Sequence, residues 1–133
     1  MSGIIVPIVE KRIFEFSYLG PSASQDVVLH PAVDVGAWYR VRIVVLVHQI
    51  TATSGNFVVT LQNTFPSEHD RQEFVDTAGF LSTASITTAS PNIKTISGTD
   101  PQGYLKVILR ANQVTSGSTL YGEFSVFLVL RDV

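Results

Sequence analysis

Hydrophobic side chains alternate with other residues along much of this chain, and that period of two constrains the fold more than any other feature. In the segment 38–50, every second residue from Val41 to Val47 is aliphatic, and an earlier segment alternates around Phe14 and Phe16. A period of two is typical of β-strands, whereas an amphipathic helix repeats every 3.6 residues. The pattern therefore predicts a β-protein.

Eight segments carry strand signals, and residues that favour turns separate most of them. We expect strands over residues 11–19, 26–30, 38–50, 56–64, 82–88, 93–97, 104–111 and 120–131. A chain of 133 residues is close to the usual size of a single domain. About eight short strands without a long helix predict an all-β fold, namely a two-sheet antiparallel β-sandwich of the jelly-roll type.

The first ten residues are apolar but interrupted by a proline. The aliphatic members are Ile4, Ile5, Val6, Ile8 and Val9. Pro7 has no amide proton for a strand ladder, which argues against regular sheet pairing in this segment. We predict an extended N-terminal arm over residues 1–10 and a single β-sandwich domain over residues 11–133. Such an arm either packs on its own domain or reaches a neighbouring subunit.

Two strands are apolar on both faces. A sandwich strand normally turns its polar side to water, yet the outward positions include Val44, Leu46, Phe127 and Val129. Contiguous apolar patches on a protein surface usually mark contact sites. Either the 66–80 loop or the N-terminal segment covers these side chains, or a partner subunit does. The second alternative predicts a protein interface made of Ile4, Ile5, Val6, Ile8, Val44, Leu46, Phe127 and Val129.

The charge content argues against several classes of partner. The net charge is −2, and only 15% of the residues are charged, against about 25% in typical domains. Nucleic-acid binding needs clustered Lys and Arg on the phosphates, and a membrane-spanning helix needs about 20 apolar residues in a row. The chain shows neither feature and contains no cysteine. We therefore expect no nucleic-acid partner, no membrane partner and no thiolate metal site.

Catalytic and metal-binding patterns are weak. The sequence has no Gly-x-Ser-x-Gly elbow, and its histidines, His30, His48 and His69, lie in different segments. Glu68, His69 and Asp70 are the densest group of ligand-type residues, but consecutive residues rarely point at one ion, so a solvated loop tip is favoured. We predict no enzyme activity, no catalytic or metal site and no cofactor.

Two smaller surface features admit more than one interpretation. Trp38 and Tyr39 open the longest strand, and an exposed aromatic platform there would indicate a carbohydrate-binding module. On predicted outward faces lie Arg40, Arg42, Lys106 and Arg110. These four form a basic patch if their strands are neighbours, although Glu123 could neutralise it within the sheet.

In layout, the chain resembles the small jelly-roll cement (decoration) proteins of tailed-bacteriophage heads. The resemblance covers most of residues 11–131. It rests on Ser/Thr-rich loops, the apolar strand 38–50, the segment 57–63 that follows it, and a terminal hairpin of residues 104–110 with 124–130. Tail and baseplate proteins of the β-sandwich type share this layout, which contains no diagnostic motif.

The resemblance implies a role without chemistry. A cement protein binds the outer shell as a dimer or trimer and stabilises capsomer contacts by protein–protein interfaces. The expected partners are thus the major capsid protein and further copies of this chain. The expected location is the capsid surface of the virion, after synthesis in the host cytoplasm.

Overall fold

A computed structural model describes residues 3–17, 24–52, 54–66, 72–73, 81–87, 93–99, 103–112 and 119–132. These residues form strands and connections and no helix, so none of them belongs to a helix that could span a bilayer. The strands are β1 (Gly3–Phe16), β2 (Ser24–Val28), β3 (Val33–Asp34), β4 (Arg40–Ala52), β5 (Asn56–Pro66), β6 (Gln72–Glu73), β7 (Leu81–Ser82), β8 (Ile93–Thr99), β9 (Tyr104–Asn112) and β10 (Leu120–Arg131).

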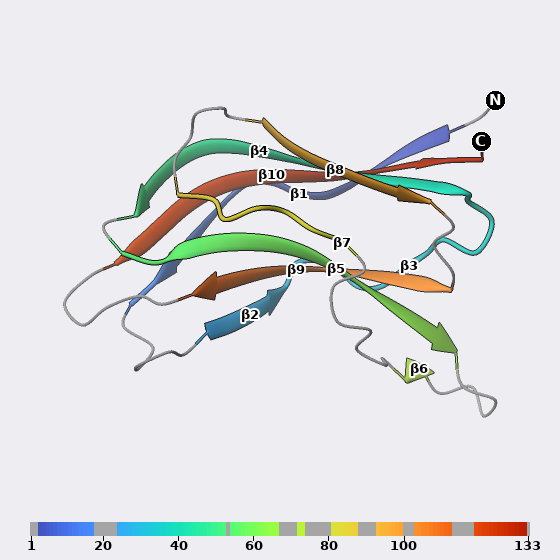
Figure 1. Ribbon diagram of the computed structural model, residues 1–133, viewed down its shortest axis with the longest axis horizontal. Helices are drawn as coiled ribbons and strands as arrows, with labels where there is room; N and C mark the ends of the chain where they lie inside the picture. The colour runs from blue at the N-terminus through green and yellow to red at the C-terminus, as the bar shows by residue number, and fades with distance from the viewer. Residues whose placement is uncertain are drawn as a thin grey trace.

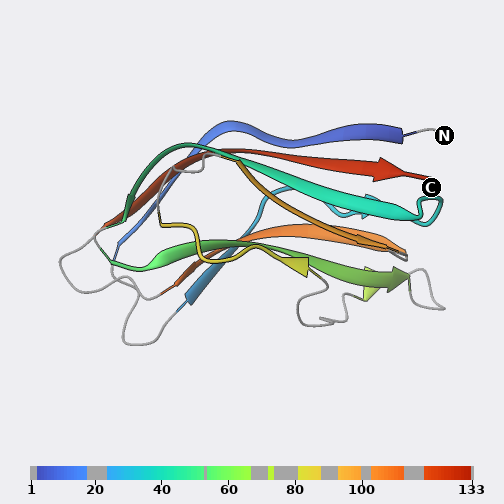
Figure 2. The same cartoon turned by 45° about the horizontal axis from the view of Figure 1, so that its top comes forward.

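The strands build two antiparallel sheets that face each other (Figures 1 and 2). Sheet A has the order β1-β10-β4-β8. Sheet B has β2, β9 and β5 in succession, with β3 beside β9 and with β6 and β7 beside β5. The predicted two-sheet antiparallel β-sandwich is therefore confirmed.

The strand pairs are nested as in a jelly roll. The first strand pairs with the last, β1 with β10, and the next pair inward is β2 with β9. The third pair is β4 with β8, and the innermost is β5 with β7. Sheets A and B each contribute two of these pairs, so the chain folds like one long hairpin wrapped around a core.

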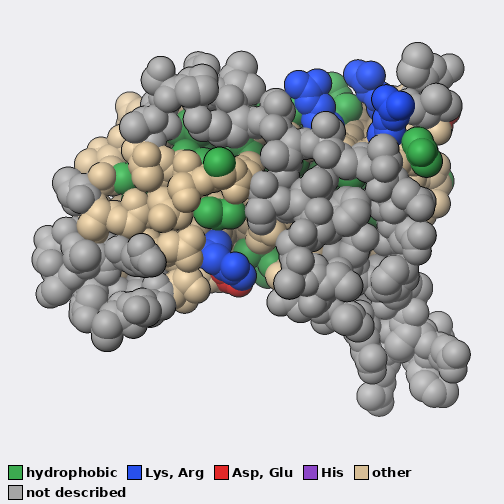
Figure 3. Space-filling model, viewed as in Figure 1, with side chains coloured by type: hydrophobic (Ala, Val, Ile, Leu, Met, Phe, Trp, Pro, Cys, Tyr) green, Lys and Arg blue, Asp and Glu red, His purple; other side chains and the backbone are tan. Residues whose placement is uncertain are grey.

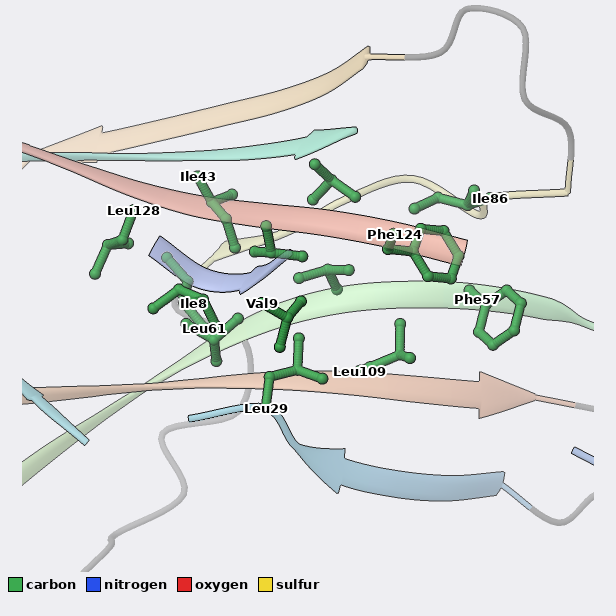
Figure 4. Close-up of a cluster of buried hydrophobic side chains, with 14 of the residues drawn as sticks. Ile8, Val9, Leu29, Ile43, Phe57, Leu61, Ile86, Leu109, Phe124 and Leu128 are labelled. Carbon is green, nitrogen blue, oxygen red and sulfur yellow. The ribbon is translucent and has the colours of Figure 1, made fainter. Parts of the chain in front are cut away.

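The alternating side chains predicted to face inward fill the space between the sheets (Figure 4). Val41, Ile43 and Val45 of β4 are 0% exposed. Phe57 meets Phe124 edge to face across the core, with ring centroids 5.0 Å apart. The predicted stripe of β1 joins them, because Phe14 and Phe16 are buried. These aromatic rings are core side chains and form no exposed platform.

A glycine makes room for this aromatic packing. A Cβ on Gly122 would lie 2.5 Å from the Phe124 ring and 2.9 Å from the ring of Phe57. Such a distance is far shorter than a normal van der Waals contact, so any side chain here would displace both rings. A second glycine, Gly55, has φ of 79° in the connection from β4 to β5, as expected for a hairpin turn.

The N-terminal segment is extended, and it is the first half of a strand. This segment pairs with β10 from Gly3, which lies opposite Arg131, to Pro7, which lies opposite Phe127. The expectation that Pro7 prevents sheet pairing is therefore corrected. The reason is that β1 is an edge strand, where proline is tolerated. The predicted boundary at residue 10 lies inside β1.

The pairing of β1 with β10 is irregular in the middle. Register shifts lie between Pro7 and Val9 and between Val9 and Arg12, and Lys11 has φ of 46°. An irregularity of this kind bends a strand, and β1 bends with its neighbours (Figure 2). The bend divides β1 into an N-terminal half, which runs level in Figure 2, and a C-terminal half, which slopes away from it.

Two expected elements fall partly or wholly outside the described residues. Of the predicted strand 82–88, the structure has β7 and then one bridge between Ile86 and Phe57. Of the 66–80 loop, one of the expected covers of the apolar outer positions, only Pro66 and residues 72–73 are described.

Candidate protein interface

The outer face of sheet A presents an apolar surface made by three neighbouring strands. Ile5 of β1 lies opposite Val129 of β10, and Phe127 of β10 lies opposite Val44 of β4. These four side chains line a shallow hollow of about 290 Å³. Each of the pairs brings together residues that are more than 80 positions apart in the sequence. The structure therefore joins half of the predicted interface residues in one place.

The members of this surface are covered to different extents. Ile5 is 67% exposed, while Val44, Phe127 and Val129 are half-buried by their neighbours in the sheet. Leu46 is also half-buried and lies opposite Ser125, one position beyond Phe127 on that face. We call Ile5, Val44, Leu46, Phe127 and Val129 the apolar face.

Three predicted interface residues lie on the other side of β1. Ile4 and Val6 pair with Leu130 and Leu128, whose side chains belong to the core. Val6 packs against that core, and Ile8 is 7% exposed within it. Ile4 is 46% exposed, because it lies at the open edge of the sheet. The alternation of β1 thus divides the apolar N-terminal segment between the core and the apolar face.

Arginines border the apolar face at the end nearest the chain termini. Arg131 lies directly opposite Arg40, and Arg42 lies opposite Val129. All three are exposed, and basic side chains gather beside hydrophobic ones over this end of the molecule (Figure 3). No carboxylate of the described residues forms a salt bridge with them. Like charges opposite each other are destabilising, so Arg40 and Arg131 repel each other across the paired strands.

The predicted basic patch of Arg40, Arg42, Lys106 and Arg110 is divided between the sheets. Lys106 and Arg110 lie on β9 of sheet B. Arg110 is neutralised locally: its Nε and Nη2 donate to the two carboxylate oxygens of Asp26, at 2.7 and 3.0 Å. Glu123 lies between Ile13 and Gln49 in sheet A, away from the arginines.

A Ser–His contact on the same face was not predicted from the sequence. The Ser125 hydroxyl lies 2.7 Å from Nε2 of His48, and the amide of Lys11 donates to Ser125 Oγ at 2.9 Å. A nucleophile–base pair has this distance, but Ser125 is only 4% exposed and no orienting group on Nδ1 of His48 is found among the described residues. The contact instead anchors the irregular part of β1 to β10 and β4.

The other chemical candidates do not form a site in the described part of the chain. Glu68, His69 and Asp70 lie outside the described residues. Elsewhere in the described ranges, no three His, Asp or Glu side chains come close enough to hold a metal ion. Trp38 is half-buried against the core, and Tyr39 next to it is 49% exposed. One exposed ring of this kind is not an aromatic platform.

Solved structures of viral particles share this fold. VP2 of infectious bursal disease virus, in its subviral particle, matches 97% of this chain with a TM-score of 0.57 and 11% identity. The structure of the Gx strain matches 97% at a TM-score of 0.57 and 11% identity, and that of the Gt strain matches 98% at 0.56 and 9%. This chain covers 32%, 31% and 32% of those chains, about a third of their length.

No protein-family model and no curated protein sequence matches the chain. The likeness to the VP2 structures thus lies in the three-dimensional arrangement of the strands. It shows that this chain has the same β-sandwich fold as the matched part of those chains.

Proposed function

We propose that the chain is a non-enzymatic structural protein of a virus particle that assembles through the apolar face of sheet A. The observation that carries this proposal is the cluster of Ile5, Val44, Phe127 and Val129 around one hollow, on a face that would otherwise meet water. Its sandwich is like that of VP2, whose structure is of a subviral particle.

More specifically, we propose a cement protein on the outer shell of a bacteriophage. The partners would be the major capsid protein and further copies of this chain, and the place of action would be the capsid surface after synthesis in the host cytoplasm. A cement protein stabilises capsomer contacts by adding buried interface, and stable interfaces bury about 1,200–2,000 Å² in total. An apolar face bordered by arginines provides both contact area and orientation.

Removing the chain from particles and adding it back tests this function. Particles that contain the chain are treated with mild denaturant until it dissociates, and the purified chain is then returned and the particles sedimented. A cement protein leaves an intact shell and rebinds to it. A shell that falls apart when the chain leaves identifies a shell-building subunit instead. Absence of the chain from particles would contradict any virion role.

A matched pair of variants shows whether the apolar face is responsible. Val44→Asp places a charge on the apolar face, while Val58→Asp places one at a half-buried position of β5 in sheet B. We expect Val44→Asp to lower particle binding at least tenfold and Val58→Asp to leave it within about twofold. Equal losses for both variants would show that the binding surface is not the apolar face.

A further inference from the structure

β1 is an outer strand of sheet A, and its two parts differ in how well they are protected against pairing with a further strand. Among the described residues, β1 pairs with β10 alone, so no described strand pairs with the N–H and C=O groups on its other side. Natural proteins protect such edges by charges, prolines and bulges, because an open edge invites another strand. After Pro7, β1 has register shifts, a positive φ at Lys11 and several charged residues. The part from Gly3 to Val6 has none of these protections.

The outer strand β2 of sheet B is protected by charge, because Asp26 is held in an ion pair with Arg110. By contrast, the Gly3–Val6 segment exposes Ile4 by 46% and Ile5 by 67%. Its β-branched side chains favour strand pairing. Figure 2 shows this half of β1 as a flat outer strand that runs to the N-terminus.

We infer that the Gly3–Val6 edge of β1 pairs with the same edge of a second copy of this chain, antiparallel and about a two-fold axis. Such a contact is isologous, because each copy supplies the same donors and acceptors. It joins two four-stranded sheets into one sheet of eight strands. The inference deepens the proposed function by naming a second copy as a partner, and it is testable without any particle.

A second copy is favoured as the partner of this edge because the same segment of two copies offers the same short length for strand pairing. Pro7 and the register shift after it limit regular pairing to the first residues of the strand, and two such segments in antiparallel orientation are of equal length. Ile5 of each copy then lies beside the dimer axis, so the two hollows become neighbours on one continuous face.

The arginines do not oppose this arrangement. Arg131 lies one strand inward from Gly3. Three strand spacings therefore separate the two Arg131 positions, about 14 Å at ~4.8 Å per strand. That separation exceeds the Debye length of about 8 Å at physiological ionic strength.

Cysteine cross-linking tests the pairing directly, since the chain contains no cysteine. In this antiparallel pairing, the outer faces of both copies lie on the same side of the joined sheet. Either Ile4 or Ile5 then lies opposite the same residue of the second copy. Ile4→Cys and Ile5→Cys are therefore each oxidised with diamide, and Ile13→Cys is the matched control. Ile13 is 55% exposed on the same strand but lies beyond the irregular part.

We expect one of the two test variants to form a covalent dimer in more than half of the molecules, and Ile13→Cys to form at least fivefold less. Disulfide geometry needs Cα atoms within about 7 Å, so random collisions do not give this yield. Yields at both positions equal to that of Ile13→Cys would overturn the inference.

A second measurement avoids any dependence on disulfide geometry. Sedimentation equilibrium of the unmodified chain should show a dimer, and Ile5→Lys should raise its dissociation constant at least tenfold while leaving the circular dichroism spectrum unchanged. A monomer at all concentrations, or a dimer that Ile5→Lys does not weaken, contradicts the edge pairing. If these results are negative while Val44→Asp still abolishes particle binding, the proposed function stands and only the edge contact is wrong.

Discussion

The two faces of β4 and β10 carry similar aliphatic and aromatic residues but have different surroundings. On the inner face, Val45 and Phe124 are 0% exposed, whereas Val44 and Phe127 on the outer face are half-buried. Both outer residues touch the sheet itself, but no layer of the described residues lies over them. Hydrophobicity alone therefore does not decide which face of a strand lies in the core. The outer face of these two strands keeps apolar area that no described residue buries.

The largest effect is expected from a charge on the inner face of β4, in contrast to the same charge on its outer face. Val45→Asp would bury a carboxylate among the aliphatic side chains of the core, at a cost of several kcal/mol. This cost approaches the whole stability of a typical domain, about 5–15 kcal/mol. We expect Val45→Asp to be unfolded by circular dichroism and Val44→Asp to be folded. Two unfolded variants would mean that the outer face belongs to the core.

Truncation of two phenylalanines of β10 probes the inner and outer faces with a milder change. Phe124→Ala removes a ring that packs against Phe14 and Phe57, and such truncations cost about 3–5 kcal/mol. Phe127→Ala removes a half-buried ring, for which we expect about 1–2 kcal/mol. Urea denaturation of both variants measures the difference. Equal losses of stability would contradict the assignment of the two faces.

The hydrogen bonds of Ser125 test whether the irregular part of β1 is anchored from the outer face. Ser125→Ala removes the acceptor of the Lys11 amide and the contact with His48. A net hydrogen bond contributes about 0.5–1.5 kcal/mol, so we expect a loss of about 1 kcal/mol in urea denaturation. The exposed Ser85 provides the control, and Ser85→Ala should change stability by less than about 0.5 kcal/mol. A loss in the control as large as that in Ser125→Ala would remove the anchoring role.

The smallest expected effect concerns the backbone of the irregular segment. Lys11 has φ of 46°, a conformation that costs non-glycine residues about 1–2 kcal/mol. Glycine avoids this cost but loses about 0.5–1 kcal/mol of conformational entropy. Lys11→Gly should therefore raise the free energy of unfolding by about 0.5 kcal/mol. A clear decrease would show that the lysine side chain stabilises the bend.

The sequence predicts the parts of the fold that depend on local alternation. Val41, Ile43 and Val45 face the core as their spacing indicates, and the strands 104–111 and 120–131 match β9 and β10 to within one residue. The sequence also indicates the apolar outer positions, because Val44 and Leu46 stand where polar residues are expected on the outer face of the strand. These features need no knowledge of which strands are neighbours.

The features that depend on register could not be predicted in this way. The pairing of Pro7 with Phe127 requires that β1 be an edge strand beside β10. The Ser125–His48 contact and the meeting of Arg131 with Arg40 join residues more than 70 positions apart. The need for Gly122 follows from two aromatic rings, one of them on the other sheet. Each of these depends on the nested strand order, which alternation does not determine.

If the apolar face is an assembly surface, a charge placed on it should prevent assembly without unfolding the protein, and both properties can be measured on the same sample. Phe127→Asp places a charge at the hollow of the apolar face. We predict that it remains folded, loses no more than about 2 kcal/mol of stability in urea, and fails to bind particles from which the chain has been removed. A variant that unfolds, or one that binds those particles like the unmodified chain, would contradict the account.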